Sequence, residues 1–173
     1  CEYDEGKKNG EYLEYYRNPK GQTKQKGNFV DNEKDGEWTK YFENGKVERA
    51  EVFSAGKKDG KHESYFENGQ LKYSVLYVDG EKSGIEKSFF EDGKPREISE
   101  YKNGMRVGTF KSYHENGKLK EIASYINGQQ TGMNKTFFDN GKLRTVGNYS
   151  NGNRAGIYKE FDQQGKLVYT STY

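Results

Sequence analysis

The sequence predicts an all-β fold, an elongated antiparallel single-sheet meander of about seven 24-residue β-hairpin repeats. Three observations predict it. A glycine recurs at a constant 24-residue interval, at Gly36, Gly60, Gly84, Gly108, Gly132 and Gly156. Further glycines divide each copy into short runs rich in the aromatic and β-branched residues that strands prefer. Asn-Gly pairs, which are typical of tight hairpin turns, recur between these runs.

The repeat is clearest when its positions are counted from the recurring glycine, which we call position 0. Positions 5 and 17 are aromatic in every copy, and position 9 is always glycine. The repeats span residues 10–35, 36–59, 60–83, 84–107, 108–131, 132–155 and 156–173, after a partial repeat at 1–9. With no linker or change of composition between them, they predict a single repeat domain over residues 1–173.

The turns predict a strand register. Asn-Gly pairs at positions 8 and 9 tolerate positive φ and are expected to form two-residue loops. Such loops would place position 6 opposite position 11, for example Phe66 opposite Leu71, and would set the position 17 ring beside the glycine at position 0. A longer loop would shift this register by one residue. A second glycine turn, near positions 19–23, connects each hairpin to the next.

Composition and charge narrow the class of protein. Apolar residues make up only 30% of the chain and charged residues 32%, but 15 Tyr, 10 Phe and two Pro argue against disorder. These values indicate a thin folded protein with little interior. The net charge of +2 comes from interspersed basic and acidic residues, so no nucleic-acid partner is expected.

The single cysteine, Cys1, excludes an intramolecular disulfide, and no run of apolar residues is long enough to predict a spanning helix. Because the sequence begins on Cys1 within a repeat, two interpretations stand. The start is artificial, or Cys1 is the lipid-attachment cysteine of a cleaved bacterial lipoprotein precursor. The second would confine membrane contact to the lipid anchor and predicts the cell envelope or secretion; the alternative is the cytoplasm.

Catalytic and metal-binding motifs find little support. His62 and His114 occupy different repeat positions, where other copies carry aromatic residues, so a packing or surface role is expected instead of acid–base chemistry. The segment 31–36 resembles the start of a calcium loop, but the twelfth residue is Phe42 instead of a bidentate Glu. We therefore predict that the protein is not an enzyme and holds no cofactor or metal.

The patterns Gly-x-x-x-x-Tyr-Phe-Glu-Asn-Gly-Lys and Tyr-x-x-Gly-x-x-x-Gly resemble MORN repeats. More specifically, they resemble the bacterial variant class often labelled as antitoxins of toxin–antitoxin systems. The resemblance covers Glu2–Tyr173 and implies a hairpin repeat fold. The chain departs from the eukaryotic pattern because it has one tryptophan, Trp38, which weakens the association of the family with phospholipids.

Position 2 is the variable position of the repeat, and it lies in the middle of a strand. Its residues are Tyr12, Trp38, His62, Glu86, Phe110, Asn134 and Tyr158. In a single sheet such side chains are expected to be at least partly exposed and replaceable with little loss of stability. We therefore predict that Tyr12, Trp38, His62, Phe110 and Tyr158 contact a partner.

The sequence thus favours a non-enzymatic scaffold that mediates protein–protein interaction, with edge strands that allow self-association. Three alternatives stay open. They are a cell-surface carbohydrate-binding module, an antitoxin or immunity-type protein, and a protein that binds lipid surfaces.

Overall fold

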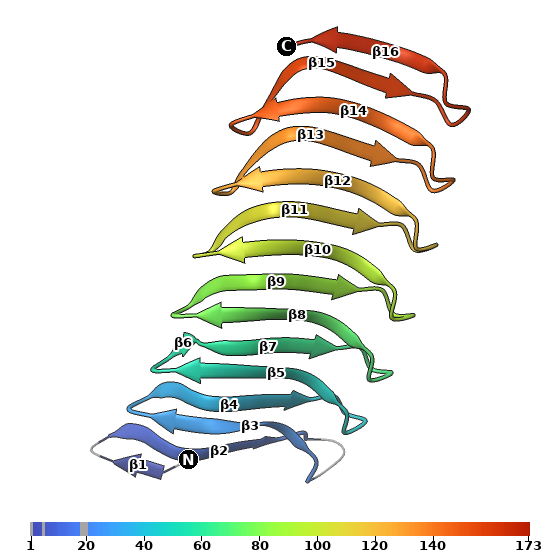
Figure 1. Cartoon of the computed structure of the whole chain (residues 1–173). Coiled ribbons are helices and arrows are strands. Elements are labelled where there is room, and N and C mark those ends of the chain that lie inside the picture. Colours follow the sequence, from blue (N-terminus) through green and yellow to red (C-terminus); the bar gives the residue numbers. More distant parts are fainter. Residues whose placement is uncertain (1, 5, 18–20) are drawn as a thin grey trace. The chain divides into compact units, whose positions relative to one another are not determined.

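The computed structural model describes residues 2–4, 6–17 and 21–173 (Figure 1). These residues form β-strands and turns, and none of them lies in a helix long and apolar enough to cross a membrane. The strands fall into two compact units, the first containing residues up to 83 with 91–93, and the second containing 84–90 and 94–173. Cys1 lies outside the described residues, so its lipidation stays a prediction.

The first unit is an antiparallel meander with strand order β1-β2-β3-β4-β5-β7-β8, and the short β6 pairs with β5. Its strands are β1 (Glu2–Asp4), β2 (Lys7–Tyr15), β3 (Thr23–Val30), β4 (Glu33–Tyr41), β5 (Val47–Ser54), β6 (Lys57–Lys58), β7 (Gly60–Tyr65) and β8 (Leu71–Val78). Each strand pairs with its neighbours in sequence, as a chain of hairpins requires.

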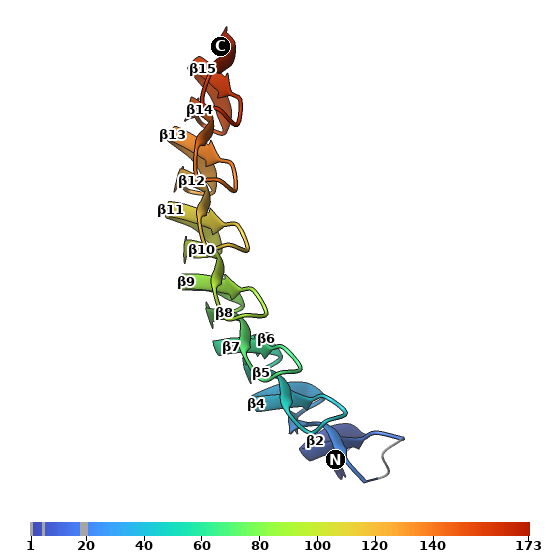
Figure 2. The ribbon, with the colours of Figure 1, turned by 90° about the vertical axis from the view of Figure 1, so that its right-hand side faces the viewer.

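The second unit continues the same pattern from β9 to β16. Its strands are β9 (Glu81–Phe89), β10 (Pro95–Lys102), β11 (Met105–Tyr113), β12 (Leu119–Ile126), β13 (Gln129–Phe137), β14 (Leu143–Ser150), β15 (Asn153–Phe161) and β16 (Leu167–Thr172). In Figure 2 the strands of this unit follow one another in a single layer. The prediction of an all-β antiparallel meander of hairpin repeats is confirmed; the single-domain boundaries stay a prediction.

The tightest turns lie between repeats and not at the Asn-Gly pairs of positions 8 and 9. At Asn103-Gly104 both residues have positive φ, 49° and 72°, which matches a two-residue type I′ turn. At Asn44-Gly45 only the glycine has positive φ, and its N–H donates to Phe42 O at 3.0 Å. This is a type I turn followed by a left-handed glycine, so the loop is longer than predicted.

The longer loop changes the register close to the turn. Tyr65 faces Leu71, so the predicted pairing of Phe66 with Leu71 is wrong. A bulge between Ser64 and Tyr65 absorbs the extra residue. The register is therefore restored farther along the hairpin, and position 17 pairs with the position 0 glycine as predicted, for example Tyr77 with Gly60.

A second bulge occurs where one hairpin joins the next. Between β12 and β13 the pairs Ile122–Lys135 and Ser124–Thr131 leave Ala123 alone opposite residues 132–134. Gly132 adopts a φ of 65° at this point, which an L-residue with a side chain rarely adopts. The recurring glycine at position 0 is therefore a requirement of the bulge, which increases the local twist of the sheet.

The bulge places the position 2 side chains in the core. We call the sheet face that carries positions 2, 4, 15 and 17 the inner face, and the face with positions 1, 3, 14, 16 and 18 the outer face. Trp38 is 2% exposed, His62 3%, Phe110 8% and Tyr158 8%, and Tyr12 is half-buried. The expectation that this position is exposed is thus wrong for four of the five predicted binding residues, because the twisted inner face lets each hairpin cover the next.

Within each unit, position 2 side chains lie on position 15 of the preceding repeat, and the matched pairs are Trp38 with Gly27, His62 with Glu51 and Tyr158 with Gly147. A Cβ added to Gly27 would overlap the Trp38 ring, and one added to Gly147 would lie 2.8 Å from the Tyr158 ring. The smaller His62 ring instead faces the Glu51 side chain. Large rings therefore pack on bare backbone, and a smaller ring meets a larger side chain.

Replacing Trp38 by Ala should reduce the free energy of unfolding by about 3–5 kcal/mol, because it removes a buried ring and leaves a cavity. The measurement is denaturant unfolding followed by circular dichroism. Ile126→Ala, at an exposed side chain, is the control and should cost less than about 0.5 kcal/mol. Equal, small losses of unfolding free energy in both variants would contradict the burial of Trp38 in the core.

Gly27→Ala should destabilise the first unit by about 1–3 kcal/mol, because the added methyl group overpacks the site beneath Trp38. Combining it with Trp38→Leu tests the mechanism, since a smaller side chain makes room for the methyl group. The double variant should lose less stability than the sum of the single variants. Strict additivity would show that Gly27 serves another purpose.

Candidate functional site

The predicted binding residues do not converge on one site. In the first unit Tyr12 and Trp38 stack with ring centroids 5.5 Å apart, and Phe29 meets Trp38 edge-on at 4.9 Å. His62 lies in a separate cluster, 4.8 Å from the Tyr77 ring. These contacts are those of a packed core, and a role in partner binding stays a prediction.

The second unit holds the other two predicted rings in separate contacts. Phe110 lies 6.4 Å from Tyr125, and Tyr158 lies 6.4 Å from Tyr173, both in edge-on geometry. The same inner face therefore repeats one packing arrangement from hairpin to hairpin. It does not gather the predicted residues into a single binding surface.

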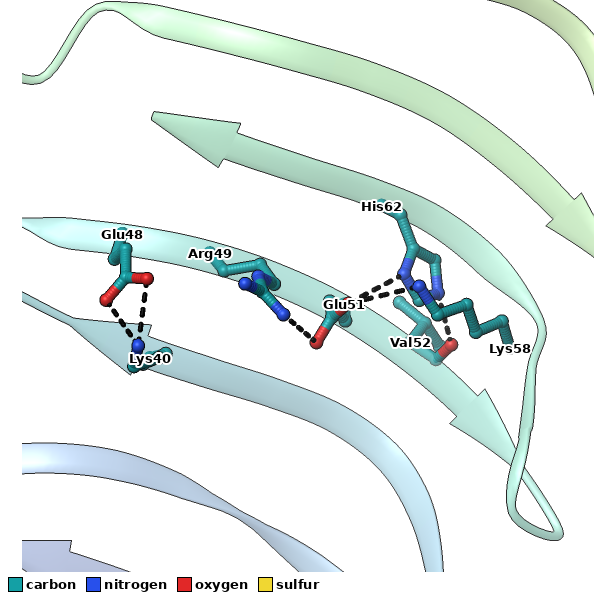
Figure 3. Close-up of polar contacts among 7 residues, drawn as sticks. All are labelled: Lys40, Glu48, Arg49, Glu51, Val52, Lys58 and His62. Atoms are coloured by element: carbon teal, nitrogen blue, oxygen red, sulfur yellow. Dashed lines mark hydrogen bonds and ion pairs between the residues drawn. The ribbon is translucent and has the colours of Figure 1, made fainter. Parts of the chain in front are cut away.

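The richest polar cluster of the first unit surrounds His62 (Figure 3). Its Nε2 lies 2.8 Å from the carbonyl oxygen of Val52, and its Nδ1 lies 3.3 Å from Glu51 Oε1. Lys58 Nζ is 3.4 Å from the same carboxylate oxygen, and Arg49 Nη1 is 3.8 Å from the other. Both ring nitrogens thus face acceptors within the protein, and neither is directed at an open position where a substrate could bind.

The cluster borders a hollow of about 250 Å³ on the inner face. Its chemistry is that of a carboxylate held between cations, which orders the junction of β5 and β7. His62 therefore occupies an aromatic position, as the sequence indicated. Among the described residues, no three His, Cys, Asp or Glu side chains are grouped so that they could hold a metal ion.

A series of cations covers the inner-face rings. They occupy position 22 of the repeat: Lys8, Lys34, Lys58, Lys82, Arg106 and Arg154. Lys34 Nζ lies 4.2 Å from the centre of the Trp38 ring, and the Arg106 guanidinium lies 4.9 Å from that of Phe110. Cations at these distances are attracted to the face of an aromatic ring. The ring faces are therefore occupied within the protein itself.

Arg154 shows the arrangement most fully. Its guanidinium lies 4.2 Å from the Tyr158 ring centre, and its Nη1 donates to Tyr173 OH at 2.8 Å. Hydrogen bonds with Tyr149 and Tyr173 raise the pKa of Arg154. For Arg106, burial lowers the pKa, but hydrogen bonds with tyrosine hydroxyls outweigh it and the pKa is raised. In the sequence, this arrangement is visible only as a recurring basic residue at position 22. An ordinary solvent-exposed face produces the same pattern.

A hollow of about 370 Å³ lies beside Arg154 on the inner face of the second unit. Its polar groups bind one another: Asn134 Nδ2 donates to Glu121 at 2.8 Å, and the hydroxyls of Thr136 and Thr145 are 2.6 Å apart. No buried side-chain nitrogen or oxygen of the described residues lacks a hydrogen-bond partner. The buried polar groups of the inner face are thus satisfied within the protein.

The outer face of the second unit differs, because large aliphatic side chains point into solvent there. Met133 is 52% exposed, Ile157 57% and Ile126 62%. They lie at positions 1 and 18, on strands whose other side carries the core. Sequence reasoning missed this surface because it interpreted the low apolar content only as a sign of a small interior.

The family model described as MORN repeat variant matches the chain in six segments: 34–54, 58–79, 82–103, 106–127, 130–151 and 154–173. Each segment begins at position 22, and all but the last end in or near the tight turn between repeats. A search of curated proteins finds no match. The bacterial subclass and the antitoxin role that the resemblance implied stay predictions.

Tyr158 provides a pH-dependent test of the inner face. Burial, followed by the 2.8 Å hydrogen bond that its hydroxyl donates to Glu160, raises the pKa of Tyr158, although Arg154 partly opposes the shift. A raised pKa means that the folded state holds the proton more tightly. Its contribution to stability is therefore complete below the ordinary tyrosine pKa of about 10 and is lost as the pH rises through the folded-state pKa.

The free energy of unfolding of Tyr158→Phe should consequently decrease less steeply than that of the natural protein between about pH 10 and 12. Urea unfolding at several pH values measures the slope. Tyr15→Phe, at an exposed tyrosine, is the matched control. A slope change of the same size in both variants would contradict the assignment to Tyr158.

Proposed function

Because the chain belongs to the MORN repeat variant family, we propose that it is a non-enzymatic repeat scaffold that binds another protein. The family supports a repeat scaffold, and the protein partner is our own inference. The inner face contributes the stability of each unit through aromatic packing. The outer face is then free to contact a partner without disturbing the core.

The observation that carries the proposal is the exposed aliphatic surface of the second unit. Met133, Ile157 and Ile126 are each more than half exposed, although they lie on regular strands with a well-packed reverse side. Contiguous apolar surface that stays exposed on a folded protein is a feature of protein-binding sites. Their burial by a partner would supply the binding free energy.

The alternatives draw less support from the same contacts. Stacking of a sugar requires an open ring face, but Arg154 covers Tyr158 and Lys34 covers Trp38. Insertion into a lipid surface often uses exposed Trp, whereas the one tryptophan of the chain, Trp38, is buried. An antitoxin or immunity-type role would itself be a form of protein binding.

The proposal is tested by selecting displayed protein fragments against the immobilised full chain. We expect enriched fragments whose affinity falls at least tenfold when Met133→Glu and Ile126→Glu are combined, because a charge there opposes apolar burial. Gln163→Glu with Gln164→Glu, at exposed residues of the loop before β16 that do not have positive φ, should leave affinity unchanged. Failure to enrich any fragment, or equal loss in both double variants, would contradict the proposal.

A further inference from the structure

A line of alternating lysine and aliphatic residues crosses the outer face of the second unit. Strand pairing places its members side by side in the order Lys87, Ile98, Lys111, Ile122, Lys135, Val146 and Lys159. We call these seven residues the lysine row. It combines position 3 of each hairpin with position 14 of the same and the preceding hairpin.

The four lysines of the row are not neutralised by neighbouring acids. Within the part of the chain that the structure describes, none of them forms an ion pair with a carboxylate. At the outer-face positions of this unit the charged residues besides the row are Glu100 and Lys102. The row is therefore a concentrated positive surface on a protein whose formal net charge is only +2.

The first unit lacks this surface at the same repeat positions. The equivalent residues there, in spatial order, are Leu13, Lys26, Thr39, Ala50, Glu63 and Ser74. They include one lysine and one glutamate, and Glu63 is paired with Lys61 at 2.8 Å. The basic and aliphatic alternation is thus a property of the second unit and does not follow from the repeat fold itself.

The spacing of the row indicates the shape of its occupant. Neighbouring strands lie about 4.8 Å apart, so successive lysines are about 10 Å apart with an aliphatic side chain midway. On one face of an α-helix, residues three or four apart advance by about 5 Å. On an extended strand, side chains on one face are about 7 Å apart. The helix matches the alternation, and long lysine side chains can follow the twist of the sheet.

We infer that the lysine row docks one acidic amphipathic helix of a partner protein, with its carboxylates over the lysines and its apolar side chains over Ile98, Ile122 and Val146. The inference rests on the proposed function and specifies the partner. Aliphatic residues between the cations do not suit single-stranded nucleic acid, which stacks its bases on aromatic rings. Exposed Met133 and Ile157 flank the row and extend its apolar contact.

The probe is a synthetic peptide in which Glu and Leu alternate every three or four positions along one face of a helix. A length of about 20 residues, or about 30 Å as an α-helix, lets it span the whole row. A peptide of the same composition in scrambled order is its control. Binding to the full chain is measured by fluorescence anisotropy at low and at physiological salt. We expect the patterned peptide to bind at least tenfold more tightly than the scrambled one, with affinity falling as salt increases.

Lys111→Glu combined with Lys135→Glu should weaken binding of the patterned peptide at least tenfold. The matched control is Lys26→Glu with Lys57→Glu, which changes the net charge equally at exposed lysines of the first unit and should have little effect. Circular dichroism checks that both double variants are folded. Equal binding of the two peptides, or equal loss in the two double variants, would overturn the inference, because charge alone would then explain binding.

Two further outcomes separate this inference from the proposed function. If displayed fragments bind the chain but Lys111→Glu with Lys135→Glu does not weaken any of them, the scaffold stands and the lysine row is not its docking site. If the patterned peptide does not bind while vesicles with anionic lipids bind in a manner that depends on these two lysines, the row contacts a lipid surface and the inference fails.

Discussion

The structure of each unit depends on one contact, in which a position 2 side chain such as Trp38 or Tyr158 lies on position 15 of the hairpin before it. A flat sheet of this thinness would bury little apolar surface, and a two-stranded hairpin alone is at best marginally stable. The bulge at the position 0 glycine increases the twist and brings the two positions together. Stability is then shared between neighbouring hairpins, as in other repeat proteins. The closest examples of this contact are Trp38 over Gly27 and Tyr158 over Gly147, where the ring lies directly on the backbone.

Much of this fold could be predicted from the sequence, because the repeat interval and the glycines that separate the strands are local signals. The repeat interval, the strand composition and the pairing of position 17 with position 0 all follow from glycine spacing and hairpin geometry. The register near the Asn-Gly turns could not be predicted, since it depends on whether both Asn44 and Gly45 adopt positive φ or Gly45 alone does so. That choice is made by hydrogen bonds that a one-letter pattern does not contain.

The candidate site was harder to predict for a related reason. Alternation along a strand tells which residues share a face, but it does not tell which face is covered. Position 2 was variable and partly aromatic, a pattern that suits either a core or a binding surface. A pairwise signal was nevertheless present, because Gly27 and Gly147 lie outside the usual turn positions and each precedes a large ring, Trp38 or Tyr158, by the same interval. Glycine opposite a large ring is evidence of packing.

The assignment of the inner face to packing has a consequence for function. Arg106, Arg154 and Lys34 lie over the buried rings, so most of the aromatic and cationic chemistry that a sequence-based search would assign to binding already serves stability. The outer face is under no such constraint, because position 3 can be Leu13, Glu63 or Lys135 without altering the core. The difference between the two units at these positions is therefore not imposed by the packing of the core. In a repeat protein of this kind, function is therefore best sought where the copies diverge on the face that the fold does not need.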